Sequence, residues 1–154
     1  MMEKKIAYNI GIRYEGFRFL RFGFVEQNIC IDEPLGVQFS VDIDGSSQLQ
    51  EGKTQIFVKV TVLFICETAK EVVANIETVS SFGLEGVPDN FDDEGQVRYP
   101  ETLLTTLVSL AISTTRGAIL AKGAGSFLEK MPLPIVDPKG FVGRSPEIEN
   151  PVAG

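Results

Sequence analysis

The chain of 154 residues has no histidine, no tryptophan and only two cysteines. Histidine is the side chain that most often acts as a general base or binds a metal. Without it, a serine or cysteine nucleophile lacks its usual partner. We therefore expect a protein that is not an enzyme and that uses no cofactor. Cys30 and Cys66 are isolated among apolar residues, which is typical of buried thiols, and a disulfide is the open alternative.

Positive charge is also scarce, because 14 Lys and Arg residues face 21 Asp and Glu residues, for a net charge of −7. Proteins that bind a phosphate backbone need clustered cations, so we expect no nucleic-acid partner. The first residues contain neither a continuous apolar run nor a small-residue cleavage site, so no secretory signal is expected. Together with the low cysteine content, this indicates a cytoplasmic protein.

The dominant feature that is present is an uncharged stretch at residues 102–115. It lies within residues 99–122, which we predict to be one long helix, with Pro100 in its first turn and Glu101 at the positive end of the helix dipole. Apolar residues recur there at helical spacing: Leu103, Leu104, Leu107, Val108 and Ala111.

Leu110 and Ile112 fall outside that apolar stripe, so the apolar surface is wider than contact with one sheet requires. We therefore predict burial on a second side, against another subunit. A membrane span is the alternative, and it needs about 20 apolar residues. Thr105, Thr106 and Ser109 interrupt a shorter run here, so membrane insertion is not expected.

Alternating apolar residues predict strands at 6–14, 17–24, 37–44, 54–66 and 71–81. Residues 17–24 have aromatic side chains on both faces of an ideal strand. We interpret them as a strand covered on both sides or at a subunit edge. A surface of aromatic and arginine residues for a nucleic acid or a peptide is the alternative, and two arginines in an acidic chain disfavour the nucleic acid.

Residues 82–87 are expected to leave the sheet and to continue into an acidic crossing segment at 88–95. Its carboxylates could bind a hard cation such as calcium, but their spacing does not fit an EF-hand loop: Asp89, Asp92, Asp93 and Glu94. A solvated loop without metal is therefore favoured. Prolines make residues 131–138 an extended segment. We expect one domain at 1–138 and a Pro- and Gly-rich tail at 139–154.

The order of these segments resembles the SecB export-chaperone family. The resemblance spans residues 5 to 138 and rests on a combination of segments: V-K-V-T-V at 58–62, F-G-L-E-G-V at 82–87, T-R-G at 115–117 and L-P-I-V at 133–136. It implies an α+β fold, with a four-stranded antiparallel sheet, a crossover loop and one long helix packed on the sheet.

The resemblance also implies a homo-oligomer, a dimer or a tetramer, with the long helices between the sheets. Candidate interface residues are Leu103, Leu107, Leu110 and Ile112. Members of the family bind unfolded polypeptides through apolar side chains beside the crossover loop. The matching positions here are Leu35, Phe82, Leu84 and Phe91.

The sequence departs from the family at the acidic positions that contact the translocase ATPase SecA. Residues 19–24 read F-L-R-F-G-F, and the matching position of the fourth strand is Asn75, so SecA binding is not expected. The family's second helix is also missing from the proline-rich tail. We therefore expect a SecB-like holdase for unfolded or aggregation-prone chains. The alternative is a non-catalytic protein of the same fold with one dedicated protein partner, such as an antitoxin.

Overall fold

The computed structural model describes residues 10–25, 35–50, 53–86, 99–130 and 133–142. Within them the chain forms four strands, β1 (Gly11–Phe24), β2 (Leu35–Gln50), β3 (Lys53–Cys66) and β4 (Glu71–Glu85). One long helix, α1 (Glu101–Lys122), follows, with two short 3-10 helices, η2 (Phe127–Lys130) and η3 (Pro138–Phe141). The predicted fold class, a four-stranded antiparallel sheet with one long helix, is confirmed.

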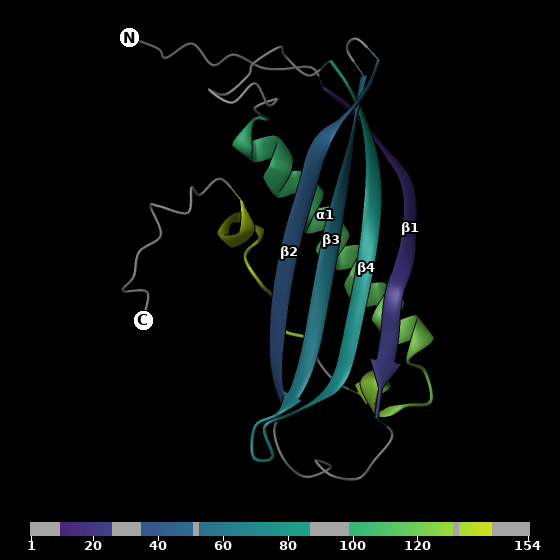
Figure 1. Cartoon of the computed structure of the whole chain (residues 1–154), viewed down its shortest axis with the longest axis vertical. Helices are drawn as coiled ribbons and strands as arrows, with labels where there is room; N and C mark the ends of the chain where they lie inside the picture. Colours follow the sequence, from purple (N-terminus) through teal and green to yellow (C-terminus); the bar gives the residue numbers. More distant parts are fainter. Residues whose placement is uncertain (1–9, 26–34, 51–52, 87–98, 131–132, 143–154) are drawn as a thin grey trace, which may run out of the picture.

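The strand order in the sheet is β1-β4-β3-β2, and all neighbouring strands are antiparallel. The chain therefore crosses from one edge strand, β1, to the other, β2, before the β3–β4 hairpin fills the middle. Helix α1 lies diagonally across one face of the sheet (Figure 1). We call this the inner face, and the opposite one the outer face.

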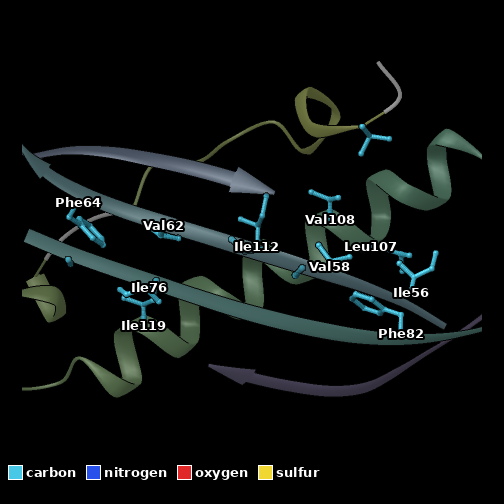
Figure 2. Packing of buried hydrophobic residues seen from close by; sticks show 14 of the residues in the cluster. Ile56, Val58, Val62, Phe64, Ile76, Phe82, Leu107, Val108, Ile112 and Ile119 are labelled. Atoms are coloured by element: carbon cyan, nitrogen blue, oxygen red, sulfur yellow. The ribbon is translucent and has the colours of Figure 1, made fainter. Parts of the chain in front are cut away.

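The core lies between the inner face and α1, because the alternating residues of β3 and β4 point towards the helix (Figure 2). These side chains have essentially no exposure, and the largest are Ile56, Val58, Val60, Val62, Phe64, Ile76, Phe82 and Leu84. The helix buries seven residues against them: Leu103, Leu107, Val108, Ala111, Ile112, Thr115 and Ile119. Burial of these apolar side chains is the main favourable term of folding.

The helix is long and apolar enough to cross a membrane by length and composition alone, with a mean hydropathy of 1.5. One side of α1, however, packs on the sheet, and the other presents hydroxyl groups such as those of Thr106 and Ser109. This arrangement favours the interpretation as a core helix. Buried Thr115 donates to the carbonyl of Ala111 at 2.7 Å, so it accepts its 2.8 Å bond from Thr78 of β4.

Two strands run further than the sequence predicts. β4 stays paired with both neighbours as far as Glu85, so Phe82 and Leu84 belong to the sheet and do not leave it. β2 continues past Gly45 to Gln50 across two register shifts.

The Tyr99 hydroxyl donates to the Gly45 carbonyl at 2.6 Å and so links this part of β2 to the start of α1. Burial, and then the charge of Asp44, raise the pKa of Tyr99.

The prediction of two buried thiols is only partly met. Cys66 is fully buried, as expected, but it is disulfide-bonded and not a free thiol. Cys30 lies outside the described residues.

In the C-terminal region, Val142 is buried in the core, so packed structure continues past residue 138. The Arg116 guanidinium donates to the Pro134 carbonyl at 2.9 Å and fastens the extended segment to α1.

Candidate polypeptide-binding surface

Two bulges in β1 place its aromatic residues on a single face of the sheet. The pairing with β4 shifts register between Tyr14 and Gly16 and again between Phe19 and Arg21. Each shift inserts one extra residue, Glu15 or Leu20, which reverses the alternation of the side chains. The inner-face positions of β1 are consequently Ile12, Tyr14, Phe17, Phe19, Phe22 and Phe24. The prediction of aromatic side chains on both faces is wrong for this reason.

Five phenylalanine rings form a continuous row along this face, which we call the phenylalanine ladder: Phe17, Phe19, Phe22, Phe24 and Phe127. Successive ring centroids are 5.2 to 5.9 Å apart, and the rings meet edge to face. This is the geometry that aromatic pairs prefer. All five rings are half-buried, so each keeps part of its surface open.

Lys122, the last residue of α1, lies over the middle of the phenylalanine ladder. Its ammonium nitrogen is 5.5 Å from the centroid of Phe19 and 5.4 Å from that of Phe22. A cation in this position is attracted to the negative faces of the rings. The ladder therefore combines apolar surface with one positive charge.

Exposed apolar side chains also gather on and next to β1. Among the described residues, eight large apolar side chains are exposed, and four belong to β1 or the residue after it: Ile12, Tyr14, Leu20 and Val25. Leu20 is the extra residue of the second bulge and is 44% exposed. Tyr14 also bonds to Ser80 at 2.6 Å and packs on Phe82. A single exposed apolar residue is ordinary, but a cluster along one strand marks an interaction surface.

The outer face of β1 is cationic. Arg13 lies 2.7 Å from Glu85 and 3.3 Å from Glu15, and its hydrogen bonds to these carboxylates raise the pKa of Arg13. Arg21 lies 3.6 Å from Glu77, which also pairs with Lys59 at 3.2 Å.

The remaining arginine of β1, Arg18, sits on the outer face opposite Val79. It makes no ion pair with any residue in the described ranges, and its side chain is exposed. The outer face of this edge strand therefore has one positive charge that is not balanced within the described structure.

The structure places the predicted polypeptide-binding residues in different surroundings. Phe82 and Leu84 have no exposure, because they lie on the inner face of β4 and belong to the core between the sheet and α1. Leu35, at the start of β2, is half-buried, and Phe91 lies outside the described residues. Half of the exposed large apolar side chains among the described residues belong instead to β1 or to Val25.

The predicted interface residues are mostly part of the core of the same chain. Leu103 is 7% exposed, Leu107 is fully buried and Ile112 is 4% exposed, since all three face the sheet. Leu110 is the exception, with 40% exposure, and Leu120, ten residues further along α1, is similarly open. Ile112 joins the core because the sheet covers a wide arc of the helix, including positions that the apolar stripe alone leaves out.

The acidic segment considered as a cation site lies outside the described residues, with Asp89, Asp92, Asp93 and Glu94. Within the described ranges, no group of three or more His, Cys, Asp or Glu side chains is arranged to bind a metal ion.

Sequence reasoning identified residues 17–24 as unusual but missed the phenylalanine ladder. An unbroken period of two assigns Tyr14 and Phe17, or Phe19 and Phe22, to opposite faces. The available signal was the spacing of the aromatics, which changes from two residues to three at Glu15-Gly16 and at Leu20-Arg21. A spacing of three in a strand is what a bulge produces.

No family model and no curated protein matches this chain. Among solved structures, it is similar to a protein of unknown function from Streptococcus agalactiae, with a TM-score of 0.53 and 11% identity over 85% of this chain and 98% of that one. A second similar structure is the Mycobacterium tuberculosis SecB-like chaperone Rv1957 in complex with a ChAD peptide from the HigA1 antitoxin. Its TM-score is 0.47, with 11% identity over 81% of this chain and 88% of that one.

At this level of identity the first comparison shows a shared fold and no more. The architecture itself, a four-stranded antiparallel sheet with a crossover connection and one long helix on its inner face, is the one that the resemblance to SecB implies. The chain therefore has the α+β architecture that the resemblance implies.

Proposed function

We propose that this protein is a SecB-like chaperone that binds unfolded or aggregation-prone polypeptides in the cytoplasm and performs no chemistry on them. The observation that supports the proposal is the partly open phenylalanine ladder beside the exposed apolar side chains of β1. A holdase needs apolar surface that accepts many sequences, and half-exposed rings provide contact area without fixed hydrogen-bond partners.

The proposal is tested by following the turbidity of a test protein diluted from guanidinium in the presence of increasing amounts of this chain. We expect suppression of aggregation at a near-stoichiometric ratio. Leu20→Asp should weaken suppression several-fold, because it puts a charge among the exposed apolar side chains of β1 without opening a cavity. Val72→Asp is the matched control, since Val72 is 50% exposed and precedes the part of β4 that pairs with β1, Ala74–Glu85.

If the wild-type protein fails to slow the aggregation of several unrelated test proteins, the proposal is contradicted. If Leu20→Asp and Val72→Asp lost the same share of the suppression of aggregation, general surface polarity, and not the β1 surface, would control the activity. Circular dichroism of both variants verifies that the sheet and the helix are intact.

A second candidate is a non-catalytic protein of the same fold that serves one dedicated protein partner. The charge pattern of β1 favours it, because Arg13, Arg18 and Arg21 on one face would select among partners by charge. Affinity capture from the native host distinguishes the two. One folded or peptide partner recovered in stoichiometric amount supports the dedicated function, and a scatter of unfolded proteins supports the holdase.

A further inference from the structure

The segment at residues 133–142, which we call the strap, lies beside α1 on the inner face of the sheet. It is extended up to residue 137 and then forms η3. It is on the same side of the sheet as α1 and passes alongside β2, as Figure 1 and Figure 2 show. Val142 at its end is 4% exposed and belongs to the core. Three further apolar residues of the strap pack partly against the core: Leu133, Val136 and Phe141.

The strap buries little of its own surface, since Val142 alone among its residues is fully buried. Its anchor to the helix is the Arg116 guanidinium, which donates to the Pro134 carbonyl at 2.9 Å. The Nε of Arg116 is buried and has no hydrogen-bond partner within the described residues, and such an unpaired donor costs free energy. Ile135, beside this anchor, is 93% exposed. A segment with few buried contacts can detach locally while the rest of the protein stays folded.

The strap does not join the sheet as a further strand. The described sheet ends at β2, and Pro134 and Pro138 have no N–H group to donate to it. The Gly140 N–H donates within the strap, to the Asp137 carbonyl at 3.0 Å. The strap therefore covers part of the inner face through side chains and is not fixed to β2 by a ladder of backbone hydrogen bonds.

The strand that the strap passes has an apolar inner side. Its alternating residues are half-buried and pack partly against the core: Val37, Phe39, Val41 and Ile43. The strap itself is an extended chain with apolar side chains, which is also the form of an unfolded polypeptide. A surface that accepts the strap therefore suits an extended apolar segment from another protein.

We propose that the strap is autoinhibitory: it occupies the inner face beside β2 and moves away before an extended apolar segment of a client binds there. The inference rests on the proposed function, because it states how access of a client to the protein is regulated. The apparent affinity for the client is then the intrinsic affinity multiplied by the fraction of molecules in which the strap is detached. A strap that is a permanent part of the core would instead only lower stability when it is loosened.

The probe is a short fluorescent peptide that alternates valine and serine and has no charge, titrated against the full chain by anisotropy. Two release variants loosen the strap. Val136→Asp puts a charge on a half-buried strap residue, and Arg116→Ala removes the hydrogen bond to Pro134 without changing the strap itself. Ile135→Asp is the matched control, because it adds the same charge to the neighbouring residue, whose side chain is already exposed.

We expect both release variants to bind the peptide about tenfold more tightly than the wild type, and Ile135→Asp to bind it as the wild type does. Peptide added to the wild type should also speed tryptic cleavage after Lys139, because a detached strap exposes the backbone of η3. Circular dichroism verifies that each variant keeps the sheet and the helix.

Unchanged or weaker peptide binding in both release variants would overturn the inference, and so would protection of Lys139 from trypsin by the peptide. An equal gain in Ile135→Asp would also overturn it, since charge and not release of the strap would then raise the affinity. The aggregation assay separates this failure from that of the proposed function. Equal suppression by the wild type and both release variants contradicts the strap and leaves the chaperone proposal intact, whereas no suppression by any of them defeats the chaperone proposal itself.

Discussion

Two glycines at and near the end of α1 show how far the role of a residue depends on its neighbours. A Cβ at Gly123 would lie 2.8 Å from the Ile119 carbonyl oxygen and 2.8 Å from the Leu128 Cβ. A Cβ at Gly117 would meet nothing within 4 Å. The first glycine lets the chain turn tightly into η2, while the second is an ordinary exposed helix position.

We expect Gly123→Ala to lower the free energy of unfolding by about 1–3 kcal/mol, the usual cost of overpacking. Gly117→Ala should raise it by roughly 0.5–1 kcal/mol, because alanine loses less backbone entropy than glycine in a helix. Chemical denaturation followed by circular dichroism measures both. If the two variants changed stability in the same direction, the close approach of Leu128 to Gly123 would not matter for folding.

At the scale of the elements, the bulges of β1 decide which surface the protein presents. Three consecutive residues of β4, Thr78, Glu77 and Ile76, pair with Phe19, Arg21 and Phe22 of β1. Leu20 therefore has no partner residue on β4 and is the extra residue of the bulge. Removing Leu20 would therefore restore a regular strand and keep every other side chain on its present face. Arg18, in contrast, pairs with Val79 of β4. Removing it would make Phe17 and Phe19 consecutive residues, and their side chains would then point to opposite faces of the sheet.

We expect the deletion of Leu20 to give a cooperatively folded protein that loses only the bulge and its exposed side chain. The deletion of Arg18 should give a less stable protein, because one phenylalanine leaves the inner face and the edge-to-face row is broken. Thermal unfolding followed by circular dichroism compares the two. Equal melting temperatures for the two deletions would contradict the register described for β1.

For the whole molecule, the open side of α1 is the candidate contact between subunits. Of the predicted interface residues, Leu110 alone is exposed, and Leu120 adds to it on the same helix. The helix has no charge between Thr102 and Thr115, so this side is not protected against association by charge repulsion.

We expect a dimer or tetramer in multi-angle light scattering, and a shift to smaller species in Leu110→Glu with Leu120→Glu. Burying unpaired carboxylates at a contact between helices costs more than the contact gains. A wild-type monomer at micromolar concentration would mean that this side of α1 is open in solution.

Local pattern was enough to predict much of the architecture. Apolar residues repeat at every second position in β3 and at helical spacing in α1, so these elements follow from residue order. The buried face of β4 includes Thr78 and Ser80, so an apolar repeat alone does not define it. The hairpin at residues 67–70 also follows from the sequence. The helix ends at Lys122 as predicted, but it begins at Glu101, two residues later than predicted, and Pro100 is its N-cap.

The pairing of strands in the tertiary structure determined which apolar residues are exposed at the surface. Phe82 and Leu84 look like an exit from the sheet in the sequence, but β1 and β3 pair with them on both sides and bury them. Ile112 looks like part of a second apolar face, but the sheet reaches far enough around α1 to cover it. The sequence determined which segments are strands and helix, because local periodicity depends on neighbours in the chain. Only the tertiary structure determined which apolar residues stay open, because exposure depends on strand partners far away in sequence and on register shifts that a fixed period of two cannot express.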